Sequence, residues 1–486
     1  TTPADRRRRR IDSRAALRSL TVTLLAVLLT LGPAGNPVRC GTQGAHCDRP
    51  ASPPGTALFE SPAGAAGYRP EADLGTDRKG SAMRDSDQHI GARIAEQRRL
   101  AHLTGRGLAQ RASVSYSLLT KVESGNRPAS PALVAAVARA LHIEASTLMG
   151  QPFQEDQRDA RYEAPLAAVR AALENWDVPL EPQTAPRPLR EVHRDVQRMN
   201  DIRRGADYLA VLSGTPPLIE ELVQHSHRLE GRELERLHRA LAFAYRCVHD
   251  ATHKLGHLDL SNIILARMVV SAEKSADPYL VMLTGFLRAQ SCFSTGRHDI
   301  GLRLMEQCLA DVAPAADRGE TPALCVQGNL RLRATILAAR TAPGVKAAAD
   351  AARAHWDEAW ETARRLGGET TNYLLSYGPS NALVHQVALE VEVGEYGRAL
   401  RLAADVHLDP GFARRYPDRV SHHLIDISRA QLWTGDRAGA YESLRQARAA
   451  APQQVRFHPQ ARDTVRALRR AADREGVGAM ARWMGV

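Results

Sequence analysis

Four segments in the second half of the chain share one spacing, which limits the possible folds more than any other feature of the sequence. Three of them contain a glycine, a small residue five positions later, a second small or apolar residue seven positions after that, and then a proline, and the segment that begins at Gly256 matches more loosely. The interval from Gly256 to Gly296 is nearly equal to the interval from Gly394 to Gly435. The four segments are 256–262, 296–314, 394–410 and 435–452.

This spacing predicts helical hairpins, because a glycine ends the first helix and small residues let the second helix pack closely. A single hairpin cannot bury its apolar face, so successive hairpins must stack. Further helices are expected at 324–340 and 345–366. The chain is 44% hydrophobic but only 5% aromatic, which favours helices over sheets. We therefore expect an all-α protein, and the repeats resemble a tetratricopeptide-like α-solenoid in which most of the consensus Trp and Tyr residues are absent.

Residues 151–215 are expected to be a linker and connecting helices. The stretch 151–160 is polar, and a helix is predicted at 162–176. Prolines between 179 and 188 predict a semi-rigid hinge. One further helix is predicted over 189–212.

A set of five helices is predicted ahead of this linker, in a domain spanning 83–150. Apolar residues recur at helical spacing from Gln88 to His102, and Thr104 precedes a second short helix. Ser115 is a suitable N-cap for the third helix, which Gly125 would end in the left-handed backbone conformation. A proline opens the fourth helix, and a short fifth helix closes the set.

Two short helices joined by a tight turn, with slim polar side chains on the second, suit the major groove of DNA, which is about 12 Å wide. The segment LAQRASVSYSLLTKVESGNRPASPALVAAVARAL resembles the phage-repressor or XRE-type helix-turn-helix family, in which L-A, S-x-S/T, a hydrophobic pair and E-x-G-x-R-x-P recur in this order. The resemblance extends over most of the five-helix domain. Together with the repeats, the chain resembles actinobacterial XRE-type regulators with a tetratricopeptide-like C-terminal domain.

The resemblance implies a role for each matching position. The third helix and its N-cap would contact base edges, the following loop would contact phosphates, and an ion pair would join the first helix to the third. The implied base contacts are Ser115, Tyr116, Ser117, Thr120 and Lys121, the phosphate contacts are Asn126 and Arg127, and the ion pair is Arg98 with Glu123.

Two positions depart from the family pattern. Gly105 stands where relatives often carry a phosphate-binding glutamine, so one expected phosphate contact is missing. Ser113 stands at the usual turn glycine, which predicts a slightly different turn.

The net charge of +11 is concentrated near the start of the chain. Residues 1–82 contribute +5, residues 83–150 contribute +4, and the rest contributes +2. The charge therefore agrees with a polyanionic partner for the five-helix domain but does not establish one.

Residues 1–82 contain a run of arginines at 6–10 and an apolar run at 20–31. This is the order of a secretory signal, and the apolar run is too short for a bilayer, which requires about 20 residues. No methionine occurs before Met83, and helical periodicity begins soon after it. We expect a disordered or misassigned leader, with an export signal as the alternative and a membrane anchor as a third.

No enzyme signature is present in the chain. We find no HExxH, GxSxG, Walker A or GxGxxG context, so we expect neither an enzyme nor a cofactor. The cysteines within the helical patterns show no CxxC spacing, which is typical of a reduced, cytoplasmic protein. They are Cys247, Cys292, Cys308 and Cys325.

Two further clusters have ordinary structural interpretations. His249, His253 and His257 share one helical face, but no acidic or cysteine ligand follows at a suitable spacing and Gly256 would end the helix first, so we expect no metal site. The pair Arg331 and Arg333 is expected to form a solvated face, with an anion site as the alternative.

The segment 370–385 differs from its Ala-, Leu- and Arg-rich surroundings. Its polar side chains, with one asparagine from an earlier helix, would supply donors and acceptors suited to a peptide backbone. The alternative is a capped helix break at Gly378 and Pro379. The candidate effector residues are Asn329, Asn372, Tyr377, Asn381 and His385.

These observations predict a nucleoid-associated, cytoplasmic DNA-binding transcriptional regulator with no membrane partner. The repeat domain, at 216–486, would form a homodimer and bind a peptide or small-molecule effector, which acts by favouring one separation of the two DNA-reading domains. The alternative is a helical-repeat scaffold for protein partners with a vestigial helix-turn-helix. A third hypothesis is an exported interaction protein.

Overall fold

The computed structural model describes residues 89–151, 160–178, 187–342, 346–471 and 475–486. All of them belong to the unit Lys79–Val486. The expectations for residues 1–82 and for the hinge at 179–186 lie outside the described residues. Within the described residues the all-α prediction is confirmed, and two short strands are the exception.

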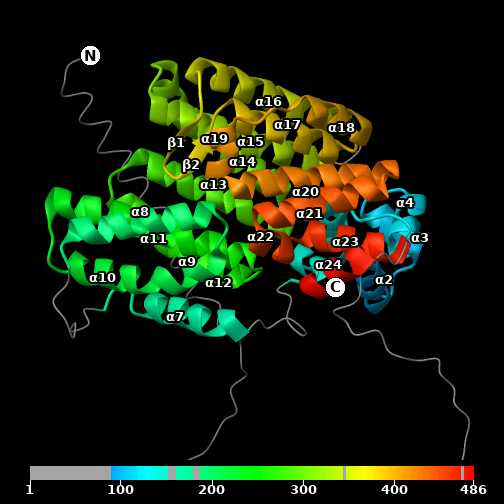
Figure 1. Cartoon of the computed structure of the whole chain (residues 1–486), viewed down its shortest axis with the longest axis horizontal. Coiled ribbons are helices and arrows are strands. Elements are labelled where there is room, and N and C mark those ends of the chain that lie inside the picture. The colour runs from blue at the N-terminus through cyan, green and yellow to red at the C-terminus, as the bar shows by residue number, and fades with distance from the viewer. Residues whose placement is uncertain (1–88, 152–159, 179–186, 343–345, 472–474) are drawn as a thin grey trace, which may run out of the picture. The chain divides into compact units, whose positions relative to one another are not determined.

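Five helices form the N-terminal part of the described chain, which we call the head (Figure 1). Thr104 and Ser115 cap the second and third of them, because each hydroxyl accepts a backbone N–H of the first turn. Gly125 adopts the predicted left-handed conformation with a φ of 73°, and Ser113 adopts it at the turn with a φ of 53°. The head helices are α2 (Ile90–Leu100), α3 (Gly105–Arg111), α4 (Tyr116–Glu123), α5 (Pro131–Leu141) and α6 (Ala145–Met149).

Shorter helices connect the head to the repeats. The prediction of one helix over 189–212 is wrong, because the chain breaks after Arg204. Ala206 has a φ of 58°, and the Asp207 side chain then caps a new helix by accepting the N–H of Ala210. The connecting helices are η2 (Ala160–Tyr162), α7 (Glu163–Glu174), α8 (Leu189–Arg204), α9 (Tyr208–Gly214) and α10 (Pro216–Ser226).

Stacked helical hairpins form the rest of the chain. Consecutive helices pack against each other, and glycines with φ between 71° and 90° end the first helices at Gly296, Gly394 and Gly435, as predicted. The paired helices are α11 (Gly231–Lys254) with α12 (Leu258–Lys274), α13 (Pro278–Thr295) with α14 (His298–Asp317), α15 (Thr321–Thr341) with α16 (Lys346–Leu366), α17 (Pro379–Val393) with α18 (Tyr396–Asp405), and α20 (Pro417–Thr434) with α21 (Arg437–Ala450). The remaining helices are α19 (Pro410–Arg415), α22 (Pro452–Phe457), α23 (Pro459–Ala471) and α24 (Glu475–Met484).

A two-stranded hairpin interrupts the repeats between α16 and α17. Strands β1 (Thr370–Asn372) and β2 (Leu375–Tyr377) pair antiparallel, and the turn residues Tyr373 and Leu374 both have positive φ. The sequence patterns did not predict these strands.

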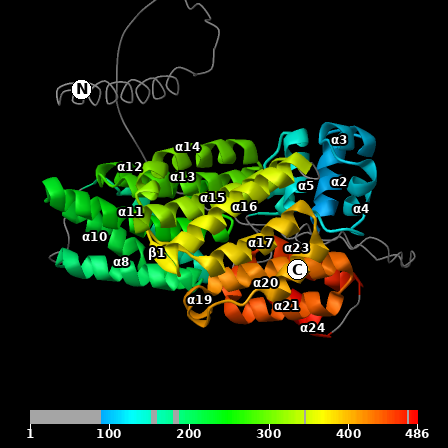
Figure 2. The ribbon, with the colours of Figure 1, turned by 90° about the horizontal axis from the view of Figure 1, so that it is seen from above.

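The head packs against two separate parts of the repeat stack (Figure 2). Arg139 of α5 donates to the carbonyl oxygen of Gly296 at 2.8 Å, which ties the head to the turn between α13 and α14. Arg470 of α23 donates to the carbonyl oxygen of Gly125 at 3.3 Å, directly after α4. The head is therefore held at two places by hydrogen bonds to backbone carbonyls. No described helix combines the length and the hydropathy that crossing a bilayer requires.

Candidate functional site

The face of α4 that points away from the head carries the residues expected to read DNA. Leu119 and Val122 are fully buried and fix the helix on the head, whereas Tyr116 is 49% exposed. Ser117, Thr120 and Lys121 are exposed on the same side, and the whole helix is eight residues long. This polar, slim face has the dimensions and chemistry of a helix that enters a major groove.

Two of the hydroxyl groups at this face also support the helix. The Ser115 hydroxyl accepts the N–H of Leu118 at 3.2 Å, and the Thr120 hydroxyl donates to the carbonyl oxygen of Tyr116 at 2.9 Å. The Ser115 oxygen therefore keeps its proton for another acceptor, and the Thr120 oxygen keeps its lone pairs for another donor.

Arg98 of α2 and Glu123 of α4 lie in contact. Arg98 donates from Nε and a terminal nitrogen to the two Glu123 oxygens at 2.8 and 2.9 Å, and it also donates to the carbonyl oxygen of Leu103. The hydrogen bond to Glu123 raises the pKa of Arg98 further. This bidentate pair fixes the end of α4 to the first helix of the head.

Gly105 lies directly beside Tyr116. A Cβ at position 105 would approach the Tyr116 ring to 3.0 Å, and the Arg106 guanidinium lies 5.6 Å from the centre of the same ring. The absence of a side chain at Gly105 therefore leaves room for Tyr116 at the start of α4.

The two residues expected to contact phosphates differ in their surroundings. Asn126 is exposed. The Arg127 guanidinium instead lies 3.9 Å from the ring centre of Trp433 in α20, and the Tyr396 ring stacks on the same indole at 4.8 Å. In this arrangement Arg127 faces the repeats, so a phosphate contact would require it to leave Trp433.

A second candidate site is a cavity of about 330 Å³ between the head and the repeats. It is lined by the first helices of five successive hairpins, α11, α13, α15, α17 and α20, and no residue of their second helices lines it among the described residues. Pro131, Val134, Ala145 and Met149 of the head form part of its wall. A ligand in this cavity would touch both parts of the protein.

Charged side chains line this cavity, and most of them are paired. Arg203 and Arg246 both bond to Asp250. Arg340 holds Glu392 through two hydrogen bonds of 2.9 and 3.0 Å. Arg429 also bonds to Glu392, at 2.9 Å, and to Asp426, at 2.8 Å. Burial raises the pKa of Glu392, but the two arginines outweigh burial and bring it to about 2, so the carboxylate is ionised.

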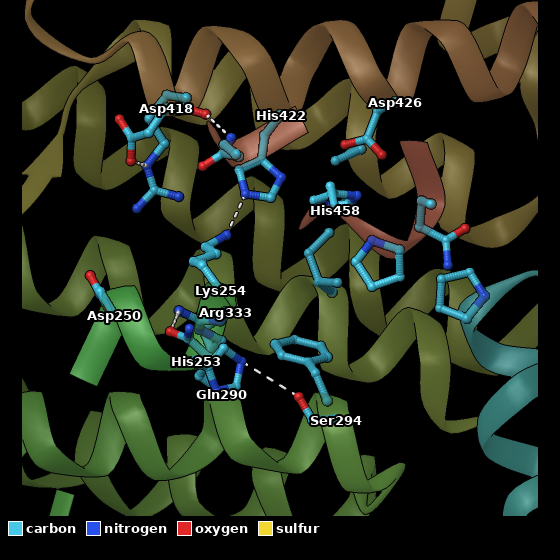
Figure 3. A pocket seen from close by; sticks show the side chains of 18 of the residues that line it. Asp250, His253, Lys254, Gln290, Ser294, Arg333, Asp418, His422, Asp426 and His458 are labelled. Carbon is cyan, nitrogen blue, oxygen red and sulfur yellow. Dashed lines mark hydrogen bonds and ion pairs between the residues drawn. The ribbon is translucent and has the colours of Figure 1, made fainter. Parts of the chain in front are cut away.

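Lys254 and Arg333 have no carboxylate within ion-pair distance among the described residues (Figure 3). Lys254 donates to Nε2 of His422 at 2.6 Å, and Arg333 donates to the Gln290 side chain at 3.5 Å. Burial, with smaller contributions from neighbouring arginines, lowers the pKa of Lys254 to about 7 and that of Arg333 to about 9.

Only two of the five candidate effector residues line this cavity, Asn329 and His385. Asn329 bonds back to the Cys325 carbonyl oxygen at 2.9 Å, and His385 shares a 2.8 Å hydrogen bond with the Asn381 carbonyl oxygen. Asn329 is buried, and its amide N–H already donates to the Cys325 carbonyl oxygen of its own helix, so it has less hydrogen-bonding capacity left for a peptide than the sequence predicted.

The other three candidates serve the fold instead. Tyr377 is fully buried and donates to the Ala359 carbonyl oxygen. Asn381 is fully buried and donates to the Ser376 carbonyl oxygen at 2.8 Å, and Asn372 donates to the Thr370 hydroxyl within β1. Their polar atoms stabilise the hairpin, which the sequence patterns did not reveal.

The expectation of a solvated face for Arg331 and Arg333 is wrong for one of the two. Arg331 pairs with Glu358 of α16, whereas Arg333 faces the cavity, 3.9 Å from the ring centre of Phe286. These two positions of α15 point to different sides, because residues two apart on a helix do not share a face.

Of the three histidines, His249 and His253 stack ring on ring within α11, at 5.8 Å between ring centres, whereas His257 lies beyond the end of α11. His249 is fully buried, His253 lines the cavity, and His257 precedes α12. The described residues contain no group of three or more His, Cys, Asp or Glu arranged to hold a metal ion.

Sequence reasoning missed most cavity residues, but the sequence contained a signal for them. Inward-facing polar residues recur at helical spacing within otherwise apolar helices, such as Arg246, Asp250 and Lys254 in α11. Charged residues are rarely buried without partners, so such a stripe in a buried helix predicts a polar interior site.

One comparison with known proteins concerns the head alone, and another extends over more than half of the chain. A family model described as a helix-turn-helix domain matches residues 89–148. Among solved structures, Bacillus thuringiensis PlcR in complex with the peptide PapR7 and DNA is 13% identical, with a TM-score of 0.22, covering 57% of this chain and 98% of that chain. The apo competence regulator ComR from Streptococcus vestibularis is 15% identical, with a TM-score of 0.20, covering 58% and 93%. No curated protein matches the chain.

Proposed function

We propose that this protein is a sequence-specific DNA-binding transcriptional regulator without enzymatic activity, of the XRE type and cytoplasmic. The observation that carries the proposal is the exposed polar face of α4 on a helix-turn-helix domain. Tyr116, Ser117, Thr120 and Lys121 contact base edges in this proposal, and Ser115 assists from the N-cap.

The protein acts as a homodimer in this proposal. Two copies of α4 would enter successive major grooves about 34–36 Å apart on a near-palindromic operator. The repeats provide the dimer contact and the effector site, and the cavity beside the head supports the second role because a ligand there touches α5 and α6.

A mobility-shift assay on the DNA upstream of the protein's own gene tests this proposal. We expect a saturable complex whose affinity falls steeply with salt, because phosphate contacts release counterions. Tyr116→Ala and Ser117→Ala should weaken binding to the operator more than binding to random DNA, by roughly 10-fold for a lost base contact of about 1–3 kcal/mol.

The matched control is Arg364→Gln, an exposed arginine of α16 away from the head, which should leave both affinities unchanged. Equal losses on operator and random DNA for Tyr116→Ala and Ser117→Ala would contradict the assignment of base contacts. If no salt-sensitive complex forms at all, the protein is better explained as a scaffold.

A further inference from the structure

The cavity between the head and the repeats contains more cationic than anionic groups. Seven arginine and lysine side chains line it, against four aspartates and glutamates. Glu392 and Asp426 balance Arg340 and Arg429, whereas Asp250 balances only one of the two arginines that bond to it, Arg203 and Arg246. The rest of the excess positive charge lies on Lys254 and Arg333, which have no carboxylate within ion-pair distance among the described residues.

Lys254 and Arg333 both face the cavity without a carboxylate partner among the described residues, so each could bind an anionic ligand. The Arg333 guanidinium lies against the rings of Phe286 and Phe293, at 3.9 and 5.4 Å, which orients it while leaving its polar edge toward the cavity. Its one hydrogen bond, to Gln290, is long at 3.5 Å. An interior guanidinium without an anion is costly, so an anion arriving here would gain strongly.

Lys254 supplies the second donor. Its ammonium lies 2.6 Å from a nitrogen of His422, and Arg333 and Arg419 are near enough for their charges to lower its pKa. Asp418, also at the cavity, is the nearby group of opposite charge that acts on it. Figure 3 shows Lys254 and Arg333 close to each other among the helices that surround the cavity.

We propose that this cavity binds a compact anion of the carboxylate or phosphate class, held by Arg333 and Lys254. The volume of about 330 Å³ lies at the lower end for ligand pockets and fits a small metabolite rather than an extended peptide while the head is docked. Glu392 and its arginines bound the site on the other side.

The anion would bridge the head and the repeats. Val134 and Met149 of the head line the same cavity, so the occupied and empty cavities differ in how firmly the head is held. This consequence for DNA binding rests on the proposed function, whereas anion binding itself does not.

Titration of the DNA-free full-length protein with citrate and, separately, with inorganic phosphate tests the proposal. Both are measured by calorimetry and thermal unfolding against sodium chloride of equal ionic strength. We expect one saturable site per chain and a rise in Tm for at least one anion. Binding of citrate alone identifies a carboxylate ligand, and binding of phosphate alone identifies a phosphate ester.

Arg333→Gln and Lys254→Gln should each weaken anion binding roughly 10- to 100-fold, as expected for a lost charge-assisted hydrogen bond. Without anion, Arg333→Gln should melt no lower than the unaltered protein, because it removes an unpaired interior charge. Arg303→Gln, in an exposed ion pair on α14, is the matched control and should bind the anion normally.

The proposal is overturned if neither anion binds beyond the chloride control, or if both cavity variants bind as well as the unaltered protein. It is also overturned if Arg303→Gln loses as much affinity. A mobility shift with and without the bound anion is read separately, so that anion binding with no DNA complex would contradict the proposed function alone.

Discussion

Gly105, which departs from the family pattern, leaves room for the Tyr116 ring at the start of α4. A Cβ at position 105 would lie 3.0 Å from the Tyr116 ring, so a larger residue there would require this exposed ring to shift by a few tenths of an ångström. The chain lacks the phosphate contact expected at position 105 and has the Tyr116 ring beside it. Tyr116 is therefore the head residue whose contribution should differ most from that in relatives with glutamine.

Buried histidines make the protein sensitive to acid. Burial lowers the pKa of His238, His298 and His423 to about 4 each, with Lys274 adding to the effect at His238 and Arg340 at His298. Below pH 6.5 the unfolded chain takes up protons that the folded chain does not, so stability is lost as the pH falls from 6.5 toward 4. At pH 5.5 each of these histidines should cost about 1.4 kcal/mol.

Denaturant unfolding at pH 7.5, 6.5 and 5.5 measures this effect. His423→Leu should reduce the loss between pH 6.5 and 5.5, whereas Gly368→Ala, which changes no titratable group, should leave it unchanged. A free energy of unfolding that stays constant down to pH 5.5 would contradict the prediction.

At the scale of elements, local patterns predicted the helices of the head and the repeats well. Thr104, Ser115 and Gly125 act within one turn of their own position, and the glycines of the repeats end helices by backbone conformation alone. The helix predicted over 189–212 failed because Ala206 takes a left-handed conformation that is uncommon for alanine.

The β1–β2 hairpin could not be predicted, because the residues that hold it in place lie in helices α15 and α16. The Tyr377 ring packs on Gly328 of α15, and its hydroxyl reaches the Ala359 carbonyl oxygen of α16. The sequence shows only a polar segment there, and three of the five candidate effector residues form hydrogen bonds within the fold. The amide and hydroxyl groups that could bind a ligand are the same kinds of group that form hydrogen bonds within the fold, so the sequence alone does not separate the two roles.

Gly328→Ala should destabilise the protein, because its Cβ would overlap the Tyr377 ring and displace β2. We expect a loss of about 1–3 kcal/mol, the usual cost of overpacking. Thermal or denaturant unfolding measures it. Gly368→Ala is the control, since the space around Gly368 is open, and a Gly368→Ala variant as unstable as Gly328→Ala would exclude the steric explanation.

At the scale of the whole molecule, the partners of Arg127 and Arg333 lie far away along the chain. Arg127 near the start of the described chain meets Trp433 near its end, and Arg333 meets a cavity built from five hairpins and the head. Sequence motifs assigned Arg127 to a phosphate and Arg333 to a solvated face because motifs describe local neighbours only. Helix α4 was predictable from local sequence patterns. The cavity was not, because it forms only when helices of five hairpins stack.

Trp433→Leu should strengthen DNA binding, because it frees Arg127 for a phosphate, whereas Arg127→Ala should weaken binding to all sequences. A desolvated cation–π contact of about 2 kcal/mol sets an upper limit of roughly 30-fold. Trp483→Leu, whose indole stacks on Arg448 within the repeats at 4.0 Å, is the control and should leave the affinity unchanged. If Trp433→Leu weakens DNA binding, Arg127 does not exchange Trp433 for phosphate.

Because the head forms part of the cavity wall, DNA binding by the head would also change the affinity of the cavity for its anion. Any factor by which a bound anion changes the affinity for an operator is the factor by which that operator changes the affinity for the anion, and typical coupling energies of about 1–3 kcal/mol correspond to roughly 5- to 150-fold. Operator DNA would then regulate anion binding in the cavity. Molecules on operators and molecules free of DNA would respond to different concentrations of the same metabolite, so the number of operators in the cell would help to set the threshold of the response.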